Sequence, residues 1–165
     1  MGEWETDAFA RRVVDALKKK KLTLSIAESC TGGLISKQIT DIPGASAVYM
    51  GGVCTYSNSS KVRLLGVSQQ ELEEYGAVSR QTAQGMAQGV RRLFATDVGV
   101  SVTGIAGPDS DATDKPVGLV YISVSFGENT RVLKIKNSYT NHVRENNRRE
   151  AARRALMLVL EIVGE

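Results

Sequence analysis

The chain has 165 residues, about the length of one domain, and its 42% hydrophobic and 24% charged residues are ordinary values for a globular protein. These values exclude a mostly disordered chain, and no apolar run approaches the ~18 residues that a membrane span needs. The net charge of +3 is too small to indicate a nucleic-acid-binding protein, for which a strongly basic stripe is expected. With one histidine and two cysteines, the chain has little material for a Ser–His–Asp triad, a multi-histidine metal site or a disulfide framework.

The first predicted element is a helix over residues 5–19. Phe9, Val13 and Leu17 recur at helical spacing, and the four lysines at 18–21 suit the negative end of a helix. We expect these lysines to form a solvated helix end rather than a binding patch. Residues 1–7 hold three acidic residues and no basic one, unlike the start of a secretory signal, which favours a cytoplasmic protein.

A strand, a helix and a second strand are predicted next. Residues 22–27 indicate a short strand, and Thr31-Gly32-Gly33 begins a helix through residue 39. Residues 47–56 are rich in β-formers, and Gly51-Gly52 suggests a bulge or a close backbone approach there.

Three helices should follow. The first covers residues 61–65, and the second begins at an S-x-x-E capping box made by Ser68 and Glu71 and ends near Gly76. Ser79 can cap the third and longest. The apolar face of this third helix is formed by Ala83, Met86, Ala87, Val90, Leu93 and Phe94.

The rest of the chain predicts three strands and a final helix. Residues 98–103 indicate a strand, 104–116 a polar loop, and the nearly apolar 117–126 a strand buried on both faces. Residues 131–136 alternate like an outer strand. A helix is expected over residues 141–163, with Ala151, Ala155, Leu158 and Ile162 on its apolar face. Together the elements predict one α/β domain over residues 1–165, a three-layer α/β/α arrangement with a mixed sheet.

The strongest local signal for chemistry surrounds Ser29. This serine follows a strand and precedes a helix, the place where open α/β sheets commonly bind ligands. Backbone N–H groups at Thr31, Gly32 and Gly33 are suited to hold an anion or a developing oxyanion. The alternative is a tight turn in which Ser29 or Thr31 is an ordinary helix cap. The segment is not a P-loop, and the chain contains no G-x-G-x-x-G.

A serine nucleophile needs a base, and lysine is a known substitute for histidine. Such a lysine must be desolvated or lie near other cations, so that it is neutral often enough to accept a proton. Lys61 is the candidate, preceded by Tyr56, which could relay or orient a proton. Taken alone, Lys61 is more typical of a surface lysine. Cys30 is a rival nucleophile, because thiolates at helix N-termini have lowered pKa values, although we expect both Cys30 and Cys54 to be small, reduced, buried residues.

A third segment, residues 102–108 (VTGIAGP), continues through the polar loop to residues 115–118 (KPVG). Thr103 and Gly104 at the end of its strand could form one wall of a ligand site. Turns between strands use the same residue types, so the segment carries little weight by itself.

The combination and order of these segments resemble the CinA C-terminal domain family. The matching stretches are residues 27–33 (AESCTGG), 51–53 (GGV) leading to 56–58 (YSN) and Lys61, 76–79 (GAVS), 102–108 and 115–118. The resemblance covers residues 22 to 160. Enzymatic members are nicotinamide-nucleotide amidohydrolases, so it implies a stand-alone, cytoplasmic bacterial enzyme that converts nicotinamide mononucleotide to nicotinate mononucleotide and ammonia, without metal or cofactor.

Carried over residue by residue, the resemblance makes Ser29 the nucleophile and Lys61 its general base, with Tyr56 assisting. The turn at Thr31-Gly32 would then hold the oxyanion. The family's glycine-rich run is replaced here by residues 109–112 (DSDA), and its Gly-Asp-Arg step by residues 142–144 (HVR), so only the arginine matches.

The phosphate of the substrate needs a cationic seat. Arg144 is the first candidate and Arg148, one helical turn later, the second. Other functions stay open: a non-catalytic nucleotide-binding or regulatory module would keep the pocket without turnover. A DNA-associated competence protein is suggested only by the family's name, and the weak charge argues against it. The helices could also support a homodimer.

Overall fold

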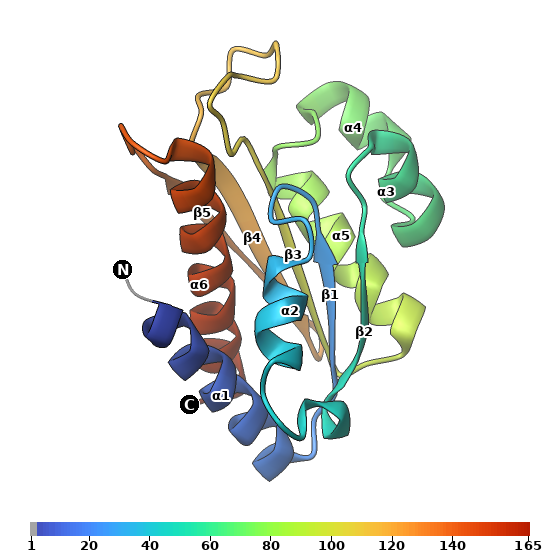
Figure 1. Ribbon diagram of the computed structural model, residues 1–165. Coiled ribbons are helices and arrows are strands. Elements are labelled where there is room, and N and C mark those ends of the chain that lie inside the picture. Colours follow the sequence, from blue (N-terminus) through green and yellow to red (C-terminus); the bar gives the residue numbers. More distant parts are fainter. Residues whose placement is uncertain (1–2) are drawn as a thin grey trace.

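The computed structural model describes the backbone of residues 3–165 and the side chains of residues 8–165, so the acidic side chains of the start at 1–7 lie outside the described residues. Helices and strands alternate along the first half of the chain, and three consecutive strands precede the last helix (Figure 1). The elements are α1 (Glu3–Lys20), β1 (Leu24–Glu28), α2 (Leu34–Thr40), η1 (Ala45–Ala47), β2 (Tyr49–Cys54), α3 (Asn58–Leu65), α4 (Gln69–Tyr75), α5 (Arg80–Phe94), β3 (Val98–Gly104), β4 (Leu119–Phe126), β5 (Asn129–Lys136) and α6 (Val143–Val163).

The five strands form one mixed sheet in the order β2-β1-β3-β4-β5. β1 runs parallel to β2 and β3, whereas β3, β4 and β5 pair antiparallel. Six of the eight residues of β4, the strand within the nearly apolar run at 117–126, are buried, while β5 alternates between more and less exposed residues. The continuous apolar run and the alternating run of the sequence therefore mark the inner and outer strands as predicted.

Helices cover both faces of the sheet. α1, α2 and α6 pack together on one face, and α5 lies on the other with α3 and α4 against it (Figure 1). The main core lies between the sheet and the first group, where Val13, Leu17 and Ile26 are almost fully buried. The predicted three-layer α/β/α arrangement with a mixed sheet is thus confirmed.

The topology gathers several loops at one edge of the sheet. The parallel strands β1, β2 and β3 all end there, at Glu28, Cys54 and Gly104, and the antiparallel β4 begins there at Leu119. Parallel strands place their carboxyl ends side by side, which is why strand ends that lie 26, 50 and 76 residues apart in the sequence could be expected to meet.

Local signals located some helix ends well. Ser68 caps α4 by accepting from Glu71 N–H (3.2 Å), and Ser79 caps α5 by accepting from Thr82 N–H (3.1 Å), as predicted. α3 begins earlier than predicted, because Ser57 accepts from Ser60 N–H and starts the helix at Asn58.

The start of α2 was predicted wrongly. Residues 31–33 form a turn and the helix begins only at Leu34, because Gly32 and Gly33 both have positive φ angles. Gly33 is the N-cap residue and supplies no side-chain bond, so neither Ser29 nor Thr31 caps the helix.

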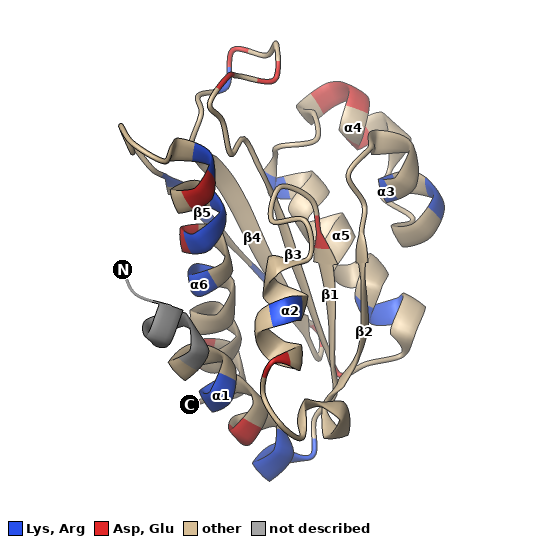
Figure 2. Ribbon diagram, in the orientation of Figure 1, with Lys and Arg blue, Asp and Glu red and all other residues tan. Residues whose placement is uncertain are grey.

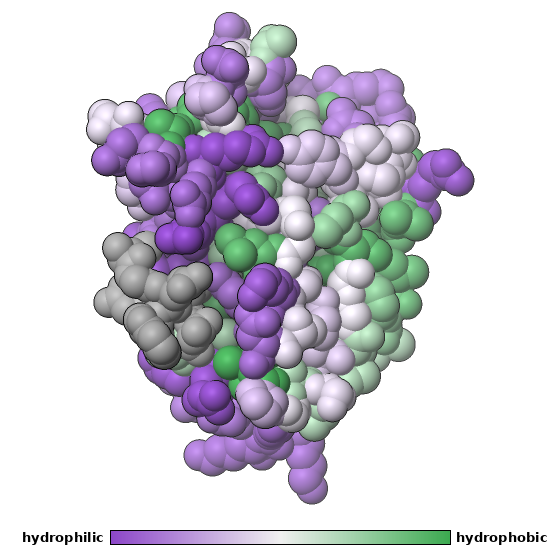
Figure 3. Space-filling view, viewed as in Figure 1, coloured by the Kyte–Doolittle hydropathy of each residue, from purple (hydrophilic) through white to green (hydrophobic). Residues whose placement is uncertain are grey.

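The surface carries two further corrections. Leu93, predicted on the buried face of α5, is 48% exposed, and Cys54, predicted to be buried, is exposed. Figure 3 shows hydrophobic residues gathered on the side where β2, α3 and the end of α5 lie, and Met50 and Leu64 are exposed there as well. The lysines that end α1 are exposed, as expected of a solvated helix end. No described helix is long and apolar enough to cross a bilayer.

Candidate active site

Ser29 and Lys61 meet at the carboxyl edge of the sheet. Ser29 is the first residue after β1, and its N–H donates to the carbonyl of Val102 on β3 (3.0 Å). Lys61 lies in the first turns of α3, and its Nζ donates to the Ser29 Oγ at 3.1 Å. Ser29 is 8% exposed and Lys61 only 1%, so the contact is nearly shielded from solvent.

The surroundings of Lys61 lower its basicity. Its Nζ also donates to the backbone carbonyl of Thr55 (2.6 Å) and, at 3.5 Å, to that of Tyr56. Burial lowers the pKa of Lys61 from the ordinary value of 10.5 to about 8, opposed in part by the nearby Cys30. Lys61 is therefore a buried lysine and not the surface residue that its segment alone would indicate. With this pKa, a fraction of the Lys61 side chains is neutral near pH 7 and able to accept a proton.

The two side chains line a cavity of about 270 Å³. Six of the residues predicted to act in catalysis or substrate binding lie around it, from four different segments of the chain: Ser29, Tyr56, Lys61, Thr103, Gly104 and Arg144. Ala77, Val78 and residues 105–107 add an apolar wall, and Asp109 and Asp111 lie at the rim. The Thr103 hydroxyl donates to the carbonyl of Ala77 (2.8 Å), which also lines the cavity.

The turn at residues 31–33 does not line this cavity. The Gly32 N–H donates to the Ser29 carbonyl (3.1 Å), and the Gly33 N–H donates to the Glu28 carboxylate (3.0 Å). These two N–H groups already have acceptors within the chain, which corrects the expectation that they hold a bound anion. The Thr31 backbone is engaged too, since its carbonyl accepts from Arg148 Nη2 (2.7 Å).

Cys30 does line the cavity, but its thiol is unsuited to attack. Burial raises the pKa of Cys30 to about 12, and the neighbouring Glu28 carboxylate adds to the shift. A thiol with so high a pKa is almost never ionised near neutral pH, and only the thiolate is nucleophilic. The rival assignment of Cys30 as nucleophile therefore fails.

Tyr56 and Arg144 form a bridge at the mouth of the cavity. The Tyr56 side chain is 63% exposed, and its hydroxyl accepts from Arg144 Nη2 (3.0 Å). Arg144 Nη1 donates to the carbonyl of Gly107 (2.8 Å). The arginine, in the first turn of α6, thus joins the loop after β3 to the segment before α3. The Tyr56 hydroxyl contacts the arginine and not the dyad, so a proton relay through it has no support in this geometry.

Charges of both signs surround the mouth (Figure 2). The loop that carries Asp109 and Asp111 is acidic, and the start of α6 carries Arg144, Arg148 and Arg149. Arg148 does not reach the cavity, because its guanidinium is bound to the Thr31 carbonyl. Among the described residues, no cluster of three or more histidine, cysteine or acidic side chains could hold a metal ion.

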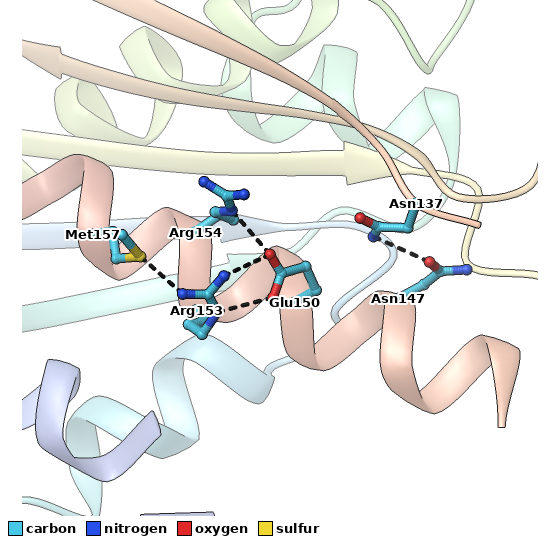
Figure 4. A network of polar contacts seen from close by, with 6 residues as sticks. All are labelled: Asn137, Asn147, Glu150, Arg153, Arg154 and Met157. Carbon is cyan, nitrogen blue, oxygen red and sulfur yellow. Dashed lines mark hydrogen bonds and ion pairs between the residues drawn. The ribbon is translucent and has the colours of Figure 1, made fainter. Parts of the chain in front are cut away.

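Two further residues support the site and were missed from the sequence. Glu28 is 1% exposed, and its carboxylate binds the start of α2. Asn147 on α6 donates from Nδ2 to the carbonyl of Ala106 in the cavity wall (2.9 Å), while its Oδ1 accepts from Asn137 (3.1 Å; Figure 4). A buried-strand acid directly before a glycine-rich helix start is a signal that could have identified Glu28.

The chain matches the family model described as the CinA C-terminal domain over residues 6–163. A CinA-like protein of Desulfovibrio desulfuricans is 49% identical over 146 residues, which cover 87% of this chain and 34% of that protein. A CinA-like protein of Dictyoglomus thermophilum is 52% identical over 123 residues, covering 74% and 30%. The chain therefore spans about a third of the length of these curated relatives.

Solved structures resemble this fold over its whole length. The competence/damage inducible protein CihA of Agrobacterium tumefaciens is 38% identical, with a TM-score of 0.91 over 100% of this chain and 98% of the other. A competence-damaged protein (CinA) superfamily protein of Escherichia coli is 27% identical, with a TM-score of 0.92 over 98% and 93% of the two chains.

Proposed function

The chain belongs to the CinA C-terminal domain family, and we propose that it is an amidohydrolase that hydrolyses the carboxamide of nicotinamide mononucleotide to nicotinate mononucleotide and ammonia. The observation that carries the proposal is the 3.1 Å contact between Lys61 Nζ and Ser29 Oγ inside a cavity. A buried lysine with a lowered pKa beside a serine hydroxyl supplies both the nucleophile and the base that amide hydrolysis requires.

The first half of the reaction forms an acyl-enzyme. Neutral Lys61 takes the proton of the Ser29 hydroxyl while Oγ attacks the carboxamide carbon, and the carbonyl oxygen becomes an oxyanion. The protonated Lys61 then gives its proton to the amide nitrogen, the C–N bond breaks, and ammonia leaves. In the second half, water attacks the ester carbon with Lys61 again as base, and the carboxylate product leaves Ser29 free.

The oxyanion needs a donor close to the nucleophile. The Cys30 N–H is the best candidate, because Cys30 follows Ser29 directly and lines the cavity. Donation from the residue after the nucleophile is the arrangement of other serine hydrolases. The turn at Thr31-Gly32, expected from the resemblance to hold the oxyanion, does not line the cavity. The proposal includes a cytoplasmic protein that works without metal or organic cofactor.

The test is direct. Purified protein incubated with nicotinamide mononucleotide should release one ammonia per nicotinate mononucleotide formed, measured by a coupled ammonia assay and chromatography of the nucleotides. Absence of turnover by micromolar protein, with nucleotide binding retained, would instead support a non-catalytic nucleotide-binding module.

Arg144 should bind the phosphate of this substrate. Its guanidinium lies at the mouth of the cavity, and the Tyr56 hydroxyl and the Gly107 carbonyl hold it in place. Removal of a charge-assisted hydrogen bond weakens binding by about 1.5–3 kcal/mol, so Arg144→Ala should raise the KM for nicotinamide mononucleotide about 10- to 100-fold. Steady-state kinetics on nicotinamide riboside, which lacks the phosphate, should change far less.

Arg149→Ala is the matched control, since Arg149 is on the same helix and pairs with Glu145 (2.6 Å) outside the cavity. An equal rise in KM for the nucleotide and the riboside would contradict the assignment of Arg144 to the phosphate.

The pH dependence of the reaction should report Lys61. Only the neutral amine can accept the serine proton, and burial lowers the pKa of Lys61 to about 8. We therefore expect kcat/KM to rise about tenfold per pH unit below that value and to level off above about pH 9. A profile that is flat from pH 6 to 9, or that falls as the pH rises, would contradict a lysine base.

A further inference from the structure

Glu28 is a buried acidic residue next to the nucleophile, and the reaction steps above do not use it. Its carboxylate accepts four hydrogen bonds from the start of α2. Three come from the backbone N–H groups of Gly33 (3.0 Å), Ile35 (3.1 Å) and Ser36 (2.9 Å), and the fourth from the Ser36 hydroxyl (2.7 Å). This carboxylate supplies the caps that no side chain at the N-cap position provides.

These bonds close residues 28–36 into a loop around the nucleophile. On one side, the Ser29 N–H is held by the carbonyl of Val102 on β3 (3.0 Å). On the other side, the Gly32 N–H returns to the Ser29 carbonyl (3.1 Å), and Glu28 ties the following turn of α2 to the end of β1. The direction in which the Ser29 Oγ leaves the chain is thereby fixed from both sides.

The other half of the dyad is held by a different set of hydrogen bonds. Lys61 Nζ is held by the carbonyl of Thr55 at 2.6 Å, on a segment 32 residues away from Ser29. The Thr55 N–H donates to the Glu28 carbonyl (2.9 Å), so this segment is tied to the end of β1, whereas the Glu28 carboxylate holds the start of α2. A shift of the turn at residues 29–33 is therefore not followed by Lys61. The 3.1 Å contact between Nζ and Oγ then lengthens, and proton transfer slows.

We propose that Glu28 is the positioning residue of the nucleophile: its carboxylate pins the first turn of α2 and so holds the Ser29 hydroxyl against Lys61. This rests on the proposed role of Ser29 in amide hydrolysis. Glutamine has the same shape but cannot replace the carboxylate, because its NH₂ group would face N–H and O–H groups that donate. One carboxylate oxygen accepts from the Gly33 and Ile35 N–H groups and the other from the Ser36 N–H and hydroxyl, so glutamine would lose one of these two pairs of hydrogen bonds.

The Glu28→Gln variant tests the assignment. A displacement of about 1 Å in a reacting group costs about 10²-fold, so we expect kcat for nicotinamide mononucleotide to fall by about that factor. The KM should change by less than about threefold, because the cavity mouth at Arg144 does not contact Glu28. A merely structural role would lower the amount of folded enzyme and would leave the kcat per active site unchanged.

Glu150→Gln is the matched control. Glu150 is also a buried carboxylate, 8% exposed, and accepts hydrogen bonds from Arg153 and Arg154 on α6, away from the cavity (Figure 4). Its loss should lower the melting temperature while kcat stays within about twofold of wild type. Ser36→Ala removes one of the four bonds to Glu28, retains the charge and stays informative if Glu28→Gln does not fold; it should give a smaller loss of kcat.

Covalent labelling separates this proposal from the identity of the substrate. A fluorophosphonate reagent reacts with an activated serine whatever the natural amide is, and active-site titration with it also counts folded sites. We expect Glu28→Gln to be labelled at Ser29 about 10²-fold more slowly than wild type. If wild type is labelled but releases no ammonia from nicotinamide mononucleotide, only the assignment of this substrate is overturned. Labelling of Glu28→Gln and Ser36→Ala at the wild-type rate, or a kcat equal to that of Glu150→Gln, would overturn the positioning role.

Discussion

The Ser29→Ala variant is expected to release ammonia from nicotinamide mononucleotide about 10⁴- to 10⁶-fold more slowly than the wild-type protein, the range found when the nucleophile of a serine hydrolase is removed. The reason is that Ser29 Oγ is the atom that forms the new bond to carbon, and no other nucleophile in the cavity is ready to replace it. Cys30 is adjacent but protonated, because burial raises the pKa of its thiol to about 12. The measurement is single-turnover kinetics with excess enzyme.

The fold should survive this change. The Ser29 hydroxyl accepts one hydrogen bond from Lys61 Nζ, which keeps its second partner, the Thr55 carbonyl. The melting temperature should therefore stay close to that of wild type. Ser46→Ala, at an exposed serine of η1, is the control and should retain full activity. If Ser29→Ala kept more than about a tenth of the wild-type kcat, Ser29 could not be the nucleophile.

The sequence was sufficient for the architecture because the fold depends mainly on local patterns. Ser68 and Ser79 cap their helices through residues three positions ahead, and the buried and alternating strands differ in composition along a single run. Errors arose where a tertiary contact decides. Phe94 packs close to the backbone of Gly51, whereas Leu93 beside it is exposed, a difference that helical spacing cannot predict.

The sequence predicted several residues of the candidate site but not the hydrogen bonds between them. Ser29, Lys61 and Arg144 could be singled out by residue type and resemblance, and all three line one cavity. The sequence could not indicate that the Tyr56 hydroxyl contacts Arg144, 88 residues away, because only the packing of α6 against the sheet brings them together.

The anion-binding groups were misassigned for a similar reason. The sequence of a helix start does not reveal whether its free N–H groups donate to a bound ligand or to a side chain of the same protein. The backbone at Gly33 has a positive φ and directs its N–H to Glu28, so the chain's own carboxylate occupies the place predicted for an anion.

The Lys61→Met variant should lose activity while keeping or gaining stability at pH 7. Methionine is of similar length and apolar, so it fills the same buried space, but it cannot accept the serine proton. General-base catalysis contributes about 10²- to 10⁴-fold, and we expect kcat/KM to fall by that amount and the limb of the pH profile near pH 8 to disappear.

The gain in stability follows from the lowered pKa. The pKa of Lys61 is about 8 in the folded protein and near 10.5 when the chain is unfolded, so between these values the unfolded state binds more protons. The free energy of unfolding therefore rises with pH across this window, and below pH 8 the folded protein carries the full penalty, about 3 kcal/mol, of charging a buried amine. Removing the amine removes this penalty but also the bonds to Thr55 and Ser29, so at pH 7 Lys61→Met should be as stable as wild type or up to about 3 kcal/mol more stable.

Urea unfolding of wild type and Lys61→Met at pH 7 and pH 10 measures this stability difference. Subtracting the two free energies of unfolding at each pH cancels the contributions of all other titrating groups. The stability advantage of Lys61→Met should shrink as the pH rises from 7 to 10, because the wild-type lysine is then neutral in the folded protein. Lys37→Met, at an exposed lysine of α2 that pairs with Asp41, should change neither kcat/KM nor this pH dependence. A Lys61→Met protein that keeps its activity would exclude Lys61 as the base. One whose stability difference from wild type does not vary between pH 7 and 10 would show that the amine is solvated and titrates normally, which removes the physical basis for a lysine that is neutral when the serine must be activated.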